Sequence, residues 1–267
     1  VHLQASGIVL RVQFNDGWRD SKGKTRSDRT GDSRSAEAAY AALEAAGSLT
    51  LTSVVEEDFE KRPRPPFTTD TLLAAAGQRL NWRPARVMRL AQQLYEAGHI
   101  TYMRTDSTRT SAAARQEVRS YIEHEWNASH LGRGVGGGGG KGVQDAHEAI
   151  RPTRPQAREP QGLEAEQMRL YALIWARFAA SQMAPSLWRR LKLAGEASGW
   201  SAAGKTEWRT FAGWEAAYAK LLKPVPQVPP LAGAAEGDTL ALDECELIED
   251  ATKPPGRYTQ HGLVAKM

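Results

Sequence analysis

The strongest constraint on the fold is a change of pattern at RPRPPF, residues 62–67. Before it, residues 48–62 (SLTLTSVVEEDFEKR) alternate apolar and polar side chains, as a half-buried strand does. After it, residues 68–80 and 84–98 place apolar side chains at helical spacing. Strand-like alternation returns in residues 186–195 (SLWRRLKLAG). This order predicts an α+β fold in which a mainly helical domain is inserted into a β-rich one.

The same change of pattern gives the domain boundaries that we expect. The β-rich domain would comprise residues 1–63 and 187–253, and the helical domain residues 64–186. Residues 254–267 would begin a further domain. The chain starts within a strand pattern and stops within a helix pattern, so we expect it to be a fragment of a longer polypeptide.

Composition excludes several classes of protein. Cys245 is the single cysteine, which excludes an internal disulfide and a cysteine-rich zinc site. The net charge of +4 fits a polyanionic partner and an ordinary soluble protein equally well. No apolar run approaches the roughly 18 residues of a membrane span, and the first residues have an early polar break unlike a signal peptide. We therefore expect a cytoplasmic protein with no membrane partner.

The start of the helical domain has the element order of a winged-helix unit. A helix over 68–80, a turn, a helix over 84–98 and a short strand over 99–103 follow one another, with Gly98 suited to cap the second helix. Winged-helix units commonly bind nucleic acids. A helical hairpin followed by an unrelated strand explains the same pattern, so both interpretations stay open on these residues alone.

Three chemically active side chains alternate along the predicted strand and the residues after it. Tyr102, Arg104 and Asp106 would share one face of an extended segment. A tyrosine hydroxyl, with a pKa near ~10, is a poor nucleophile unless a neighbouring group assists it. A guanidinium favours the phenolate and binds phosphate through two hydrogen bonds, so this trio suits attack on a phosphodiester. On spacing alone, an ordinary half-buried strand face is the more usual explanation of such a trio.

Longer motifs distinguish the two explanations. The stretch LYEAGHITYMRTDSTRTS (94–111) resembles the active-site tyrosine motif of type IA DNA topoisomerases, in particular the bacterial topoisomerase I group. PFTTDTLLAAAGQRLNW (66–82), QDAHEAIRPT (144–153) and PPGRYTQHGLV (254–264) resemble further family segments in the same order. The resemblance covers residues 64–190 and 254–267, and it is weak over residues 1–60.

The resemblance implies roles for individual residues. Tyr102 would be the nucleophile that becomes linked to a 5′ phosphate, and Arg104 would bind that phosphate. Asp106 and His147 would form a supporting pair, although His147 also has a structural interpretation as a cap or core histidine. The implied DNA contacts come from the helix before the tyrosine, from the basic surface around it and from the last segment. These residues are Gln92, Tyr95, Arg109, Arg257 and Thr259.

The resemblance also implies a function for the whole enzyme. It would cut one strand of single-stranded or underwound DNA, pass a strand through the gap and reseal it, relaxing negative supercoils without ATP in the bacterial nucleoid. Family members bind Mg²⁺ through an Asp-x-Asp cluster of a Toprim domain, which this sequence does not contain. The fragment alone would therefore be inactive and bind no metal; it would be monomeric and would work with the remaining domains of its polypeptide.

Two alternative functions remain compatible with the sequence. The first is a non-catalytic winged-helix DNA-binding module, which would explain the helix–turn–helix order and the basic residues. The second is a decatenating enzyme of the topoisomerase III type. The wording of the helix at 66–82 and of QDAHEAIRPT favours the topoisomerase I group over the latter.

Overall fold

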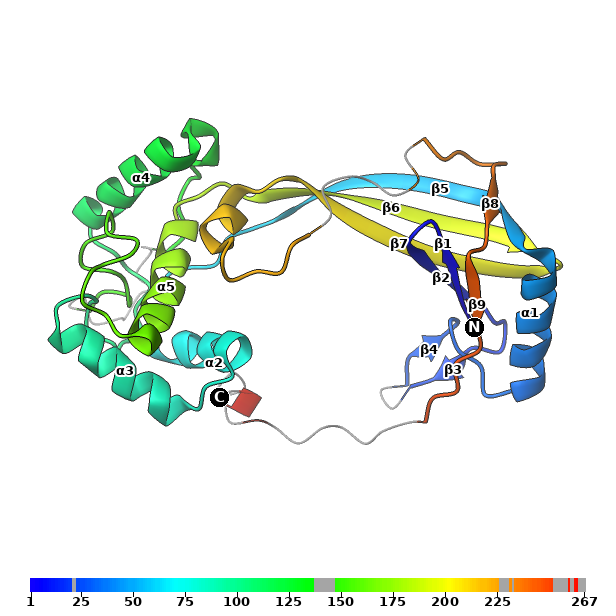
Figure 1. The fold of residues 1–267 in the computed structure, drawn as a ribbon, viewed down its shortest axis with the longest axis horizontal. Coiled ribbons are helices and arrows are strands. Elements are labelled where there is room, and N and C mark those ends of the chain that lie inside the picture. Colours follow the sequence, from blue (N-terminus) through cyan, green and yellow to red (C-terminus); the bar gives the residue numbers. More distant parts are fainter. Residues whose placement is uncertain are drawn as a thin grey trace. The chain divides into compact units, whose positions relative to one another are not determined.

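The structure, a computed structural model, divides into two compact units (Figure 1). It describes residues 1–20, 23–136, 147–225, 231, 233–251, 259 and 262–263. As far as these residues allow, the first unit consists of Val1–Phe59, Trp188–Thr210 and Val225–Pro254. The second unit consists of Glu60–Leu187, Phe211–Pro224 and Pro255–Met267, with the same restriction. The inserted helical segment thus clusters separately from the strands on either side of it.

A seven-stranded sheet with the order β8-β5-β6-β7-β2-β1-β9 forms the basis of the first unit (Figure 1). Pairing is antiparallel between β1 and β2, β1 and β9, β2 and β7, and β5 and β8. The ends of the three longest strands, β5, β6 and β7, continue into residues of the second unit. The strands are β1 (His2–Ala5), β2 (Ile8–Val12), β5 (Ser48–Lys61), β6 (Ser186–Ala197), β7 (Trp200–Phe211), β8 (Thr239–Ala241) and β9 (Glu244–Glu246).

Two serine–glycine pairs close hairpins of this sheet. Ser6 and Gly7 join β1 to β2 with φ values of 47° and 77°, and Ser198 and Gly199 join β6 to β7 with 50° and 79°. Two consecutive residues with positive φ define the turn whose twist matches that of the flanking strands. Glycine adopts positive φ without steric cost, which explains its place in both turns.

The helix α1 (Ser33–Ala46) supplies the rest of the first core. Asp32 caps its first turn by accepting from the backbone N–H groups of residues 34 and 35, and Gly47 ends it in the left-handed conformation. Ala39 and Leu43 are buried with the alternate residues of β2. The polar stretch before α1 contains a small ladder of β3 (Trp18–Arg19) and β4 (Thr25–Arg26).

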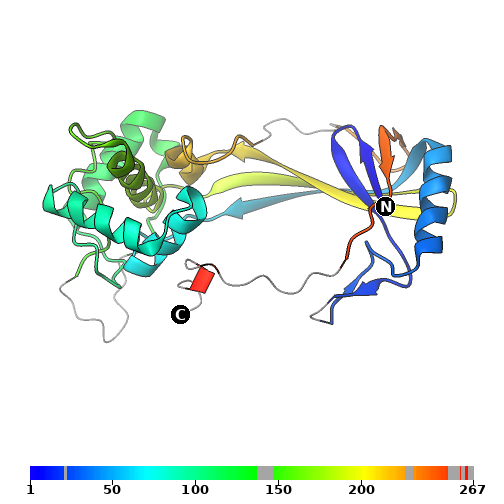
Figure 2. The same ribbon diagram turned by 60° about the horizontal axis from the view of Figure 1, so that its bottom comes forward.

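The second unit is helical, and α5 (Ala165–Ala180) lies at its centre (Figure 2). Its residues Tyr171 and Trp175 are almost completely buried, and Trp175 Nε1 donates to the carbonyl of Pro155 at 2.7 Å. Helix α5 packs against three helices and one 3₁₀ helix. These are α2 (Thr69–Leu80), α3 (Pro84–Glu96), α4 (Ala112–Trp126) and η2 (Gly213–Tyr218), and a further 3₁₀ helix, η1, spans Ala128–His130.

The last long strand ends within an alternating stretch of the sequence. Residues 207–218 alternate like a strand, but β7 ends at Phe211 and η2 follows. Gly213 has a φ of 49° and lies so close to the Pro185 carbonyl oxygen that a Cβ would stand 2.2 Å from it. This close approach turns the chain out of the sheet, and it depends on a contact distant in sequence.

Among the described residues, no helix is long and apolar enough to cross a membrane.

Candidate active site

Residues 100–109, here called the tyrosine segment, are extended but belong to no sheet. The short strand predicted over residues 99–103 is absent there; in its place is a single bridge between Ile100 and Pro152. Side chains nevertheless alternate as they would in a strand. Met103, Thr105 and Ser107 are buried, at 1%, 9% and 4% exposure. The side chains of Tyr102, Arg104 and Asp106 are exposed, with Tyr102 at 42%.

The first turn of α2 anchors one side of this segment. Thr68 caps the helix in a box with Thr71, which fixes the turn. The backbone N–H of Thr69 donates to the Thr105 carbonyl at 2.8 Å, and its hydroxyl donates to the Met103 carbonyl at 2.8 Å. The Thr105 N–H in turn donates to the Thr69 hydroxyl at 2.9 Å. A helix turn thus satisfies the backbone groups that a neighbouring strand would otherwise pair.

Residues 147–153, the HEAIRPT stretch, anchor the other side of the tyrosine segment at Thr101, directly before Tyr102. The backbone N–H of Thr101 donates to the Arg151 carbonyl at 2.9 Å. The Thr101 hydroxyl donates to the Ala149 carbonyl at 2.7 Å and accepts from the Arg151 N–H at 3.0 Å. The sequence motif that contains His147 therefore lies beside the tyrosine segment, and Thr101 connects the two.

Glu148 and Arg151 link this motif to the start of α4. Glu148 accepts from the backbone N–H of Ser111, the α4 cap, and from the guanidinium of Arg151. The Arg151 side chain is 11% exposed and also donates to the Pro152 carbonyl at 2.9 Å. Its Nε has no hydrogen-bond partner within the described part of the chain. Sequence reasoning missed Thr69, Thr101, Glu148 and Arg151, although all four residues lie within the motifs it had singled out.

The end of α3 places a second tyrosine next to Tyr102. Gly98, with a φ of 74°, follows the helix, and the His99 and Gly98 N–H groups donate to the carbonyls of Leu94 and Tyr95. This paired capping arrangement fixes the direction in which the chain leaves α3. The rings of Tyr95 and Tyr102 meet edge to face, with centroids 5.3 Å apart. Both rings are about 40% exposed, so they form a small aromatic surface open to solvent.

The structure brings the predicted site residues together only in part. Arg104, Asp106 and His147 are exposed, and none of them forms a side-chain hydrogen bond or ion pair with any described residue. In particular, no hydrogen bond or ion pair joins Asp106 to His147. Gln92 on α3 donates to Glu96 at 2.7 Å. Tyr102, Arg104 and Asp106 are therefore exposed side chains on a backbone that is anchored on both sides.

The remaining predicted DNA contacts are Arg109, Arg257 and Thr259. The Arg109 carbonyl accepts from the Ala149 N–H at 2.7 Å, which adds to the pairing between the tyrosine segment and the HEAIRPT stretch. The Thr259 hydroxyl accepts from the Gly262 N–H at 3.1 Å. Arg257 lies outside the described residues.

Replacing Thr69 by valine should loosen the anchor of the tyrosine segment. Valine has the same shape as threonine but cannot donate to Met103 or accept from Thr105, so buried backbone groups lose their partners. We expect a loss of about 1–3 kcal/mol in the free energy of unfolding. Thermal denaturation measures it, and Thr52→Val, at an exposed threonine of β5, is the control that should keep the native stability. Equal stability of the Thr69 variant and the native protein would contradict the assigned role of Thr69.

The residues in this structure do not fit a metal ion. Within the described ranges, no three histidine, cysteine, aspartate or glutamate side chains gather where they could hold one. Divalent magnesium is bound through several oxygen ligands, most often carboxylates and water. The Mg²⁺ that the resemblance implies therefore has no set of ligands among these residues.

Comparisons with known proteins identify the family. The model of the DNA topoisomerase family matches residues 8–267. The chain is 40% identical to DNA topoisomerase 1 of Vibrio cholerae over 210 residues, covering 77% of this chain and 24% of the relative. It is 37% identical to DNA topoisomerase 1 of Streptomyces coelicolor over 290 residues, covering 98% of this chain and 30% of the relative. The chain thus spans less than a third of either relative.

A solved structure agrees with these matches. Full-length topoisomerase I from Thermotoga maritima superimposes with a TM-score of 0.78 at 27% sequence identity. The match covers 100% of this chain and 42% of that protein. Its mixed helix-and-strand architecture is therefore shared over the whole chain. The family model, the relatives and the structure agree, and the chain belongs to the DNA topoisomerase family that includes the bacterial DNA topoisomerase 1 proteins.

Proposed function

We propose that this chain contributes the nucleophile of a type IA DNA topoisomerase. The observation that carries the proposal is the anchored tyrosine segment, in which Tyr102, Arg104 and Asp106 are exposed while the residues between them are buried. Such an arrangement holds the backbone in place and leaves the reactive side chains accessible to a DNA strand. Family membership supports this interpretation over that of a solvated surface.

The proposed reaction is a transesterification. The phenolic oxygen of Tyr102 forms a bond with a DNA phosphorus atom, and the bond between that phosphorus and the 3′ oxygen breaks. The phenol releases its proton, and the departing 3′ oxygen takes one up. The product is a 5′-phosphotyrosyl ester, whose reversal by the same 3′ hydroxyl reseals the strand. Because the ester keeps the energy of the broken bond, resealing requires no ATP.

Arg104 is proposed to stabilise the charge on the attacked phosphate. A guanidinium binds two phosphate oxygens at once and favours the phenolate form of a nearby tyrosine. Its lack of a carboxylate partner among the described residues leaves it available for this contact. Asp106 and His147 are proposed as the supporting pair, and their exposure allows a DNA strand to come between or beside them.

The DNA strand is proposed to follow α3 toward Tyr102. Gln92 and Tyr95 lie on the last turns of α3, and Tyr95 offers a ring on which a base can stack. Arg109, Arg257 and Thr259 would contact the backbone of the strand. The contribution of α3 arginines is reduced, because Arg86 and Arg89 both lie near the carboxylate of Glu166.

Further parts of the proposal concern domains and partners. We assign the β-rich gate domain to residues 1–63 and 187–253, the tyrosine domain to residues 64–186, and the start of a DNA-binding domain to residues 254–267. The helices α2 and α3, joined by a tight turn at Asn81, would form a winged-helix-like unit. Single-stranded or underwound DNA of the bacterial nucleoid would be the substrate, and the protein would act as a monomer.

Magnesium would be bound by a Toprim domain outside these residues. The whole enzyme would relax negative supercoils, and the residues described above would be inactive by themselves. This division of work follows from the family resemblance, since the acidic cluster of that domain has no counterpart here.

A covalent trapping experiment tests the proposed function. The full-length protein is mixed with labelled single-stranded DNA, denatured with detergent and separated by electrophoresis. We expect a denaturant-resistant adduct, and peptide mapping should place the DNA on Tyr102. A non-catalytic winged-helix module would bind the DNA without forming any adduct. Attachment to another residue would show that the nucleophile is misassigned.

A further inference from the structure

The second unit contains a cationic cavity that the proposed strand cleavage does not use. Its volume is about 720 Å³, and it is lined by α2, α5, η2 and the linker before α2. Among its described lining residues, one is acidic, Asp70, and five are basic. The basic residues are Lys61, Arg62, Arg64, Arg79 and Arg177.

Two of these arginines, Arg177 and Arg79, are held in place by aromatic side chains without being neutralised. The guanidinium of Arg177 lies 4.3 Å from the ring centroid of Phe67, and its Nε donates to the Tyr218 hydroxyl at 3.1 Å. Arg79 lies 5.1 Å from the ring centroid of Tyr218. Neither they nor Arg64 lie within ion-pair distance of a carboxylate in the described part of the chain, whereas Arg62 pairs with Glu60 at 2.6 Å. The walls therefore carry a net positive charge on ordered groups.

The positive charge of Arg177 is destabilised by its position in the cavity. Burial lowers the pKa of the Arg177 guanidinium, and the positive charges of Arg64 and Arg79 add to this effect. A partly buried charge without an opposite charge is costly, and a bound anion would offset both the burial and the mutual repulsion.

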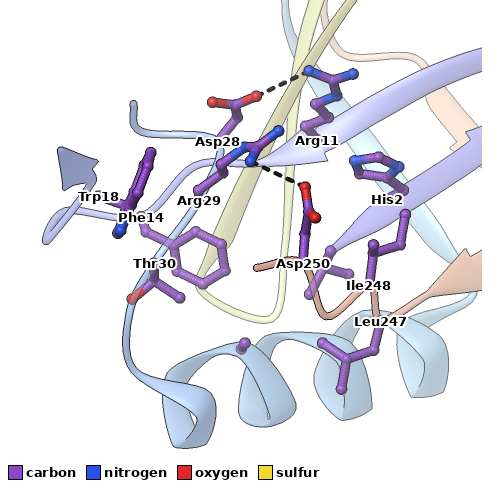
Figure 3. A pocket seen from close by; sticks show the side chains of 12 residues that line it. His2, Arg11, Phe14, Trp18, Asp28, Arg29, Thr30, Leu247, Ile248 and Asp250 are labelled. Atoms are coloured by element: carbon purple, nitrogen blue, oxygen red, sulfur yellow. Dashed lines mark hydrogen bonds and ion pairs between the residues drawn. The ribbon is translucent and has the colours of Figure 1, made fainter. Parts of the chain in front are cut away.

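A cavity in the first unit provides the contrast (Figure 3). It has a volume of about 260 Å³, and it too contains arginines. There, however, Arg11 pairs with Asp28 at 2.9 Å and Arg29 pairs with Asp250 at 3.5 Å, as the dashed lines in Figure 3 show. The two arginines of that cavity are already paired with aspartates, so their positive charges are not available to bind an anion.

We propose that the cavity between α2 and α5 binds a phosphate group through Arg64, Arg79 and Arg177. Guanidinium groups bind phosphate by paired hydrogen bonds, and three of them converge here. The volume exceeds what a bare phosphate requires, and Trp214 and Tyr218 add aromatic surface, which favours a phosphate of a DNA strand over the free ion. Tyr102 does not line the cavity, so this site is separate from that of strand cleavage.

The cavity and the tyrosine segment nevertheless share one helix. Thr69 in the first turn of α2 holds the backbone of Met103 and Thr105, and the next two residues, Asp70 and Thr71, line the cavity. A DNA strand bound in the cavity would therefore contact the helix that anchors the nucleophile.

Salt-dependent DNA binding tests the proposal. Arg64→Gln and Arg79→Gln each remove one charge from an exposed side chain of the cavity, so the fold should be retained. Arg154→Gln removes one charge from an exposed arginine of the same unit that does not line it. All three are made in full-length protein carrying Tyr102→Phe, so that cleavage does not contribute. Binding of a labelled single-stranded oligonucleotide is measured by anisotropy over a range of salt concentrations.

For each cavity variant, the plot of log K against log salt should become less steep by about 0.7, the value for one phosphate contact on a single strand. The Arg154 control should keep the native slope. Calorimetry with inorganic phosphate is the second arm. Weaker phosphate binding together with an unchanged DNA slope would assign the site to free phosphate. Unchanged behaviour in both arms, or an equal loss of slope in the control, would overturn the proposal.

Discussion

Replacing Tyr102 by phenylalanine in the full-length protein is expected to abolish the covalent DNA adduct and the relaxation of supercoiled plasmid. The variant removes only the oxygen atom that would attack phosphorus. The Tyr102 side chain makes no hydrogen bond with any described residue and is 42% exposed, so the fold should be unaffected. Its ring can keep the edge-to-face contact with Tyr95. Denaturing electrophoresis and a plasmid relaxation assay measure the two activities.

A matched control separates loss of the nucleophile from a general effect of losing a phenol. Tyr121 on α4 packs edge to face against Trp126 and Trp175, and its replacement by phenylalanine should leave adduct formation unchanged. DNA binding by the Tyr102 variant should stay within about twofold of the native protein, since a single exposed hydroxyl contributes little. An adduct in the Tyr102→Phe variant would show that another residue attacks the DNA.

Arg104→Lys is expected to slow strand cleavage despite keeping the positive charge. An ammonium group cannot make the paired contact with two phosphate oxygens that a guanidinium makes. Removal of one such charge-stabilising donor costs about 3 kcal/mol in the barrier, or roughly a hundredfold in rate. Single-turnover cleavage of an oligonucleotide measures this rate directly.

Two further variants show what the arginine contributes. Arg104→Gln removes the charge as well and should be slower than Arg104→Lys. Arg133→Lys, on an exposed arginine outside the tyrosine segment, should cleave at the native rate. Cleavage by Arg104→Lys at the native rate would mean that the charge alone matters and that the fork geometry of the guanidinium does not.

Local signals in the sequence predicted the helices well. Gly98 follows α3 as expected, because capping depends on a few neighbouring residues. Apolar side chains at helical spacing likewise mark α5, of which nine residues are buried. The mixed α and β composition was likewise evident from periodicity. Each of these features is determined within one or two turns of chain.

Features that depend on distant contacts were predicted less well. A short strand was expected over residues 99–103, and the side chains of residues 102–107 do alternate in burial. The partners of the tyrosine segment, however, are a helix turn at Thr69 and a loop at Ala149 and Arg151, which no local pattern indicates. The cationic cavity is likewise assembled from separate segments of chain. Sequence reasoning proposed which residues are chemically active but did not indicate the groups that hold their backbone in place.

The alternation around Tyr102 constrains the length of this stretch of chain. Met103, Thr105 and Ser107 are buried, and the residues between them face solvent. Deleting or inserting one residue after Tyr102 would exchange the two sets, as a one-residue shift does in any extended segment. Charged side chains would then be buried without partners at a cost of several kcal/mol. Single substitutions on the exposed face should therefore be tolerated by the fold, whereas changes in residue number should not.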